Sequence, residues 1–504
     1  MSNDMAVCYK RTSSDDTFEF IDTTDVLSVK LTGEASKHLF TGNQNNFIQM
    51  TEATSPTSKR TGPLTLEQFQ GLRDSDGRLV DESSLRRAVF LGGIEPGARK
   101  EVWQYLFALY PCNSTKRERE ALLLDYIVKY EEMKSRWKEI LKASAPPGAS
   151  DLEQGLVARY QLPDGSLHLS PDLTTAPLQY FNPDLVQHQP VGQEREPTLR
   201  EVAKHCKFLD ANSPETKQQI SFMKIQAQVF VNRQKLDATE IRNCLRLIDK
   251  DVPRTDRDVH YFKDSTTPSL TMLREMLITY AAFQPTIGYA QGMNDIIARF
   301  LFVFDSEVEA YWCFHNYLEK IKTDFLEEGM VGKIVLVRKL LLEMDKPLLE
   351  HLEQHDLGDL IFCHRWLLLG FKREFSFLDS LRVFEILSSH HLELSSMEAE
   401  TAKRRQLMKD FANTGGMART APVQADSEFT FELFMCVALL QHCRDQLLTC
   451  TDAAMVFDVI NHLDIQLDNI LEKSEQLFFK YCRKTVEDSF QIVDTPSKVR
   501  HQKR

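Results

Sequence analysis

The feature that most constrains the fold is a stretch from about 216 to 480 in which apolar residues recur at intervals of three and four. In "SLTMLREMLITYAAF", for example, one stripe is formed by Leu270, Leu273, Leu277 and Tyr280. This interval matches the turn of an α-helix, so each such segment predicts an amphipathic helix with one buried face. Alternating runs of β-branched residues, which would predict strands, are scarce. We therefore expect an all-α domain.

The same periodicity begins earlier, at about residue 83, and gives the expected domain the range 83–480. Gly92-Gly93 and Pro96-Gly97 mark a turn between its first two helices. Two polar segments interrupt the pattern, at about 144–215 and about 391–427. Loops of that length inside a domain are unusual, and we expect both to be mobile insertions.

The two ends of the chain differ from this domain in composition. Residues 1–82 are rich in Ser, Thr, Asp and Gly, with few apolar residues and no periodic pattern. Such a composition predicts a largely disordered N-terminal segment. Residues 481–504 form a C-terminal tail that ends in the basic run "SKVRHQKR".

Charge and cysteine usage exclude several classes of function. The formal net charge is −12, which argues against a general nucleic-acid-binding protein. The ten cysteines form no C-x-x-C pair, which is typical of reduced thiols in a cytoplasmic protein. The start of the chain has no signal-peptide pattern, and its apolar runs are shorter than the about 18–20 residues of a spanning helix. We expect a cytoplasmic protein whose contact with membranes is indirect or peripheral.

The common signatures of enzymes are absent from the sequence. It has no P-loop, no dinucleotide-binding glycine motif, no nucleophile elbow and no H-E-x-x-H zinc motif. The pair His390-His391 could suggest a metal site, but a helix end running into a polar loop explains it better. We expect no metal site in this chain.

An arginine after a proline is the first candidate functional residue. In "LIDKDVPRTD" (247–256), Pro253 prevents a simple continuation of the preceding helix, so Arg254 lies at the edge of a loop. Asp251 could hold its guanidinium in one orientation through a bidentate contact. Taken alone, the pattern fits a solvated surface arginine better than a functional one.

A glutamine in "GYAQGMND" (288–295) is the second candidate. The amide of Gln291 has one acceptor and two donors and is suited to orienting a water molecule. Gly292 permits a conformation that other residues resist, and Asn294 or Asp295 could cap the next helix or brace the loop. An arginine and a glutamine on two loops are what assisted GTP hydrolysis requires: one neutralises phosphoryl charge, and the other positions the attacking water.

These two stretches resemble motifs of the TBC domain family of Rab GTPase-activating proteins. The arginine-finger motif I-x-x-D-x-x-R and the glutamine-finger motif Y-x-Q-G-M are both present, as are R-x-x-x-W and the signature "RWLLLGFKREF" at 365–375. The four motifs occur in the family's order, with similar character continuing to about 480. The residues that carry the first three are Ile248, Asp251 and Arg254, then Tyr289, Gln291, Gly292 and Met293, then Arg99 and Trp103.

The resemblance implies a fold of two helical lobes and a mechanism. Arg254 would enter the nucleotide site of a GTP-bound Rab in trans, and Gln291 would replace the catalytic glutamine of the Rab. Asp251, Tyr289, Gly292 and Asn294 would support the two finger loops. The chain would need no cofactor of its own, because GTP and Mg²⁺ are bound by the Rab. It would activate a GTPase without being a hydrolase itself, and would thereby regulate membrane trafficking.

Two local resemblances give narrower expectations. "GGIEPGARKEVW" and "FKREFSFLD" are most similar to family members that act on endosomal and autophagy-related Rabs, which implies recruitment to endosomal or autophagic membranes. "SDDTFEFI" (14–21) resembles a docking motif for ubiquitin-like autophagy modifiers, with acids at Asp15 and Asp16 before Phe18 and Ile21. The alternative for this stretch is a solvated segment or a strand of a small N-terminal fold.

Two other functions stay open at this point. The chain could be a catalytically weak TBC scaffold that binds Rabs or autophagy modifiers without accelerating hydrolysis. It could also be a helical adaptor in which the N-terminal motif matters most. The presence of both Arg254 and Gln291 favours catalysis, because a scaffold would be free to lose either residue.

Overall fold

The computed structural model describes residues 7–11, 18–22, 60–144, 213–263, 269–392 and 429–494. The chain divides into two compact units, Met1–Thr57 and Ser58–Arg504. In the first unit, strands β1 (Val7–Arg11) and β2 (Phe18–Asp22) pair antiparallel, with Val7 opposite Asp22. None of the helices in the described ranges is both long and apolar enough to cross a bilayer.

Most of the predictions for the N-terminal segment concern residues that lie outside the ranges described by the structure. Of the expected docking motif, Asp15 and Asp16 lie outside the described residues, whereas Phe18 and Ile21 belong to strand β2. The expected insertions at 144–215 and 391–427 also lie almost entirely outside them. The expectations about disorder and mobility in these segments therefore stay predictions.

The second unit is helical and begins earlier than the predicted boundary at residue 83. Helix α1 (Leu66–Gly71) starts at a capping box between Thr65 and Gln68. The side chain of Phe69 is fully buried, and Leu64 and Leu79 are nearly so. Residues 60–82 belong to the helical unit because these apolar side chains complete its core.

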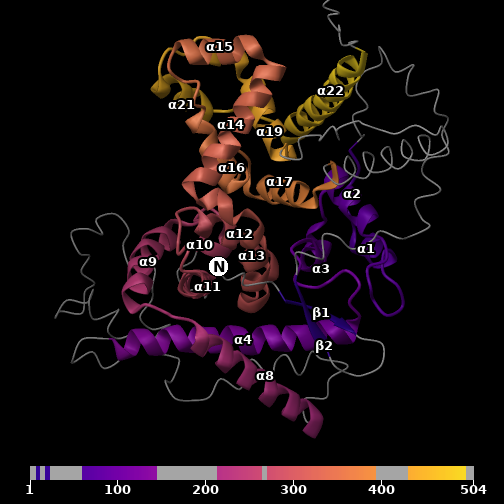
Figure 1. Cartoon of the computed structure of the whole chain (residues 1–504), viewed down its shortest axis with the longest axis vertical. Helices are drawn as coiled ribbons and strands as arrows, with labels where there is room; N and C mark the ends of the chain where they lie inside the picture. The colour runs from indigo at the N-terminus through magenta and orange to yellow at the C-terminus, as the bar shows by residue number, and fades with distance from the viewer. Residues whose placement is uncertain are drawn as a thin grey trace, which may run out of the picture. The chain divides into compact units, whose positions relative to one another are not determined.

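The first lobe of this unit is built by the helices up to α13. They enclose one continuous apolar core, in which α12 is buried on all sides and carries Phe300 and Leu301 at its centre. Figure 1 shows α9 to α13 gathered together, with α4 running beside α8. The helices are α2 (Glu82–Gly92), α3 (Pro96–Leu106), α4 (Lys116–Ala143), α8 (Pro214–Arg233), α9 (Ala238–Asp251), α10 (His260–Lys263), α11 (Ser269–Phe283), α12 (Met293–Phe304) and α13 (Glu307–Ile321).

The second lobe has a separate apolar core around α19, which is also buried on all sides. Helix α22 packs along α19 and continues to Asp494, so the predicted tail at 481–504 begins inside a helix; residues 495–504 lie outside the description. The helices are α14 (Glu327–Met344), α15 (Lys346–Gln354), α16 (His364–Leu369), α17 (Phe377–Ser389), α19 (Phe431–His442), α20 (Arg444–Leu447), α21 (Ala453–Asn461) and α22 (Leu467–Asp494). The predicted all-α fold with two helical lobes is confirmed.

Helix α17 joins the two lobes, because its side chains enter both cores. At this junction the buried carboxylate of Glu385 accepts hydrogen bonds from Arg99 Nε at 2.5 Å and from Trp103 Nε1 at 2.9 Å. Arg99 and Trp103 are four residues apart on α3 and therefore share one helix face. Burial raises the pKa of Glu385, although Arg99 opposes that shift. The R-x-x-x-W motif thus has a structural role, because it links α3 to α17 through buried hydrogen bonds.

The buried contact between Arg99 and Glu385 leads to a prediction about stability. Replacing Arg99 by methionine removes the charge that compensates Glu385, whose side chain is 0 % exposed. An unpaired charge in such a site costs about 3–5 kcal/mol, so we expect Arg99→Met to lower the free energy of unfolding by that amount in urea denaturation. Lys346→Met is the control, because the Lys346–Glu350 pair is exposed and worth at most about 1 kcal/mol. Equal losses in the two variants would contradict this account of the junction.

Candidate functional site

The first candidate loop begins where α9 ends. A single 3-10 turn, η6 (Val252–Arg254), follows the helix directly and buries Val252 and Pro253. The apolar face of α9 is also buried, which fixes the helix behind the turn. Arg254 is the exception, with 61 % of its side chain exposed. The sequence therefore folds into a rigid turn that presents one guanidinium to solvent.

The carboxylate of Asp251 connects this turn to the second loop. One of its oxygens, Oδ1, accepts a short hydrogen bond from the guanidinium of Arg254. The other, Oδ2, accepts the hydroxyl of Tyr289 at 2.6 Å. The predicted bidentate contact is therefore replaced by a single-nitrogen contact, because Tyr289 occupies the second oxygen. The arginine keeps further donors available for another acceptor.

Tyr289 is well suited to this role as a donor. Burial and the neighbouring Asp251 carboxylate raise the pKa of Tyr289 far above its ordinary value. Its hydroxyl consequently stays protonated at any physiological pH, and the hydrogen bond to Asp251 persists. Arg254 and the loop that follows Tyr289 are held by one carboxylate.

A second chain of hydrogen bonds connects the same two loops. Asn294 Oδ1 accepts the backbone N–H of Gly292 at 3.2 Å, while its Nδ2 donates to Thr255 Oγ1 at 2.9 Å. The hydroxyl of Thr255 in turn donates to the carbonyl of Asp251 at 2.9 Å. Of the two predicted roles for Asn294, the structure shows the brace, because the residue at the N-terminus of α12 is Gly292 and no side chain caps that helix.

Gly292 has a backbone conformation that requires glycine. Its φ is +105°, and a β-carbon built on it would lie 2.9 Å from Leu369 Cδ2. Between this fixed residue and the anchored Tyr289 stands Gln291, which is exposed and makes no side-chain hydrogen bond among the described residues. The loop thus immobilises the backbone on both sides of Gln291 and leaves its amide available.

A lysine for which the sequence predicts no role, Lys372, connects the two loops from the segment between α16 and α17. Lys372 Nζ donates to Asp256 Oδ2 at 2.6 Å and to Asp295 Oδ1 at 2.9 Å. Arg373 contacts the other oxygen of Asp295 at 3.2 Å. The sequence contains the pair Lys372-Arg373 inside the family signature "RWLLLGFKREF", but that signature alone predicts no partner for the lysine.

The acidic character of the arginine loop is largely neutralised in the folded protein. Asp249 pairs with Arg274 at 2.6 Å, Asp251 with Arg254 and Asp256 with Lys372. Burial would raise the pKa of Asp295, but Lys372 and Arg373 outweigh it and hold that pKa below its ordinary value. The carboxylates therefore serve as fixed partners for basic side chains, and they repel an approaching anion less than the sequence suggests.

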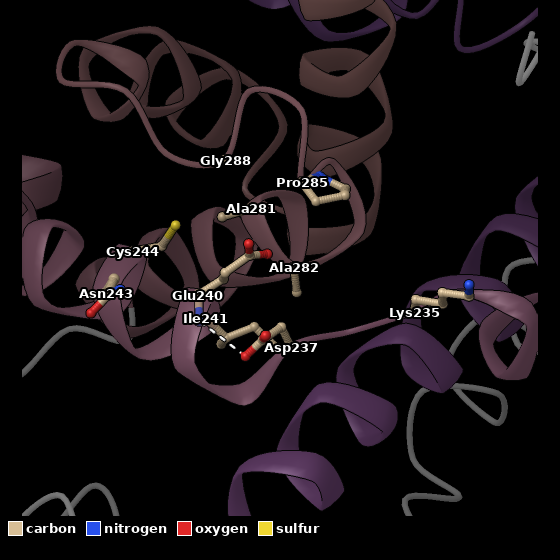
Figure 2. Close-up of a pocket in the computed structure, with 10 residues that line it drawn as sticks. All are labelled: Lys235, Asp237, Glu240, Ile241, Asn243, Cys244, Ala281, Ala282, Pro285 and Gly288. Carbon is tan, nitrogen blue, oxygen red and sulfur yellow. Dashed lines mark hydrogen bonds between the residues drawn. The ribbon is translucent and has the colours of Figure 1, made fainter. Parts of the chain in front are cut away.

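A small pocket lies next to the glutamine loop, but neither candidate residue lines it. It is formed between the start of α9 and the end of α11 and has a volume of about 210 Å³ (Figure 2). Its wall includes Asp237, Glu240, Cys244, Ala281, Pro285 and Gly288.

Among the described residues no cluster of three His, Cys, Asp or Glu side chains could hold a metal ion. Arg254 and Gln291 are presented on the surface, which suits a macromolecular partner better than a small molecule.

Comparison with known proteins gives consistent matches. Residues 202–399, which include both candidate loops and Lys372, match the family model of the Rab-GTPase-TBC domain. TBC1 domain family member 17 of Mus musculus is 28 % identical over 334 residues, 66 % of this chain and 38 % of that protein. The GTPase-activating protein GYP7 of Debaryomyces hansenii is 27 % identical over 365 residues, 72 % of this chain and 41 % of that protein. The chain thus spans about two fifths of the length of these relatives.

One solved structure in the comparison is the Ypt/Rab-GAP domain of Gyp1p. It superposes on 83 % of this chain, and 98 % of its own chain is covered. The TM-score is 0.49 and the sequence identity is 16 %.

The geometry of Gly292 generates a prediction. In Gly292→Ala the new methyl group meets Leu369 and the backbone keeps a positive φ, so we expect the free energy of unfolding to fall by about 1–3 kcal/mol. Gly332→Ala is the matched control: Gly332 lies inside α14, and nothing lies within 4 Å of its added β-carbon. That variant should gain about 0.5–1 kcal/mol. Urea denaturation of both variants checks the sign, and a stabilised Gly292→Ala would contradict the strain described here.

Proposed function

This chain belongs to the TBC-domain family of Rab GTPase-activating proteins, and we propose that it accelerates GTP hydrolysis by a GTP-bound Rab. The observation that carries the proposal is the shared carboxylate of Asp251, which orients an exposed arginine and anchors the loop of an exposed glutamine at the same time. The names of its relatives, which include GTPase-activating proteins, support the same class of activity.

Arg254 is the proposed arginine finger. Its guanidinium would enter the nucleotide site of the Rab and neutralise the charge that develops on the transferring phosphoryl group. A finger supplied in trans accelerates hydrolysis by about 10³–10⁵, which corresponds to about 4–7 kcal/mol of barrier. The ion pair with Asp251 supports this role, because it holds the side chain in one orientation before the partner arrives. A pre-oriented arginine loses less conformational entropy when it binds.

Gln291 is the proposed glutamine finger. Its amide would position the attacking water with one acceptor and two donors, in place of the glutamine of the Rab. Its exposure and its lack of a hydrogen-bond partner among the described residues support this, since the amide does not have to break an internal contact first. Neither finger requires a cofactor in this chain, because GTP and Mg²⁺ would be bound by the Rab.

The narrower assignments rest on local sequence alone. Resemblance to family members that act on endosomal and autophagy-related Rabs supports action on such a Rab and peripheral recruitment from the cytoplasm to those membranes. The stretch from Asp15 to Ile21 supports a ubiquitin-like autophagy modifier as a second partner. Deletion of residues 1–59 tests the second assignment, because it should abolish modifier binding and leave GTP hydrolysis unchanged.

The central experiment is single-turnover GTP hydrolysis with a panel of purified Rabs. We expect the wild-type chain to accelerate one or a few of them. Arg254→Ala should lose about 10³–10⁵ of that acceleration, and Gln291→Ala about a hundredfold or more. Arg338→Ala serves as control, because Arg338 is an exposed residue of α14 that pairs with Glu353 in the second lobe.

The result also separates catalysis from a scaffold role. Binding to Rabs without acceleration of any of them would identify a scaffold. Acceleration that survives Arg254→Ala would exclude the arginine-finger mechanism, whatever the substrate. Circular dichroism of each variant establishes that the loss of activity is not a loss of fold.

A further inference from the structure

We propose that Lys372 is a positioning residue that fixes the arginine loop and the glutamine loop relative to each other. This inference rests on the proposed function and adds a third component to the same site. Among the described residues, Lys372 makes no hydrogen bond or ion pair with either finger side chain. Its ammonium group binds Asp256, two residues after Arg254, and Asp295, four residues after Gln291. It acts through the backbone of the two loops.

The geometry of this ammonium group is that of a clamp. Nζ makes three hydrogen bonds, to Asp256 Oδ2 at 2.6 Å, to Asp295 Oδ1 at 2.9 Å and to the Asp295 carbonyl at 3.1 Å. An ammonium has three donors, so every one of them is used. The side chains are 5 % exposed for Lys372, 14 % for Asp256 and 10 % for Asp295. In such a poorly hydrated place these contacts are stronger than they would be in water.

The lysine is itself fixed, because the segment that carries it is anchored in the second lobe. Phe371 is fully buried in the core of that lobe. Arg365 binds Glu374 at 2.8 Å, which closes the turn between α16 and α17. Arg299 of α12, in the first lobe, donates to the carbonyl of Leu369 and holds the same segment from the other side. The clamp therefore fixes the positions of both finger loops relative to the segment between α16 and α17, which belongs to neither loop.

Removing the charge has a consequence for position as well as for stability. Without the ammonium, the carboxylates of Asp256 and Asp295 lose a cation that hydrogen-bonds to both of them, and like charges at short range repel. The buried guanidinium of Arg299 also acts electrostatically on both carboxylates, but it donates its hydrogen bond to the carbonyl of Leu369. Arg373 still contacts Asp295, but 56 % of its side chain is exposed and its contact does not reach Asp256. The two loops would move apart, and a misplacement of about 1 Å in a catalytic group can cost about a hundredfold in rate.

The chain contains a matched control for this effect. Lys134 on α4 also lies between two carboxylates, those of Glu275 and Glu307, and its side chain is 3 % exposed. It joins α4 to α11 and α13, and within the described part of the chain it makes no hydrogen bond or ion pair with the arginine loop or the glutamine loop. Lys134→Met thus creates the same type of buried defect without touching the clamp.

The kinetic test compares Lys372→Met, Lys372→Arg and Lys134→Met with the full chain. For Lys372→Met we expect kcat for hydrolysis by the GTP-loaded Rab to fall by about tenfold to a hundredfold with little change in KM, because the binding surface stays and the alignment is lost. Lys372→Arg should recover part of kcat, since a guanidinium can still bridge the two carboxylates. Lys134→Met should lower the melting temperature and leave kcat unchanged. Equal kcat in the two methionine variants would overturn the proposal.

A second measurement needs no Rab at all. Hydrogen exchange of the backbone amides should accelerate in Lys372→Met at 252–258 and 288–295 together, and in Lys134→Met at neither. Unchanged exchange at both loops would overturn the clamp even if the chain is an active GTPase activator. Conversely, a chain that accelerates no Rab but shows the coupled exchange would refute the proposed function and retain the clamp.

Discussion

The buried carboxylate of Asp251 is the interaction on which the rest of the site depends. It lies at the last residue of α9, and it is bound on one oxygen by Arg254 and on the other by Tyr289. An exposed arginine on a free loop samples many rotamers, and fixing it later costs conformational entropy. Here the folded protein has already met that cost, because the packing of α9 places the carboxylate and the carboxylate places the guanidinium.

The surroundings of this carboxylate show how a surface site can be rigid without being a pocket. Asn294 and Thr255 connect the backbone of Gly292 to the carbonyl of Asp251 through a chain of hydrogen bonds, so these polar groups find their partners inside the protein. Arg254 and Gln291, the groups proposed to meet the partner, are exposed. The site therefore combines order in the backbone with available donors and acceptors at the tips.

Several parts of this structure could be predicted from the sequence, and their physical character explains why. The helices follow from apolar periodicity, which is a local signal, and Arg254 and Gln291 stand in short motifs that carry their own chemistry. The role of Lys372 could not be predicted, because its two partners lie 116 and 77 positions away along the chain. Pairing of distant charges depends on the completed fold. Residues 60–82 resembled a disordered segment because their apolar residues, among them Leu64, Phe69 and Leu79, are few and the helix in this stretch, α1, is only six residues long.

The buried contact between Arg99 and Glu385 has a consequence for anyone who divides this chain into fragments. Residues 202–399 hold every side chain of the proposed mechanism, including Lys372, but they do not include α3. A fragment cut to that range would retain Glu385 in an apolar junction and lose the arginine and the indole that satisfy it. It would also lack α19 and α22, which build the second core. The smallest segment that contains the chemistry is therefore smaller than the smallest segment that can fold around it.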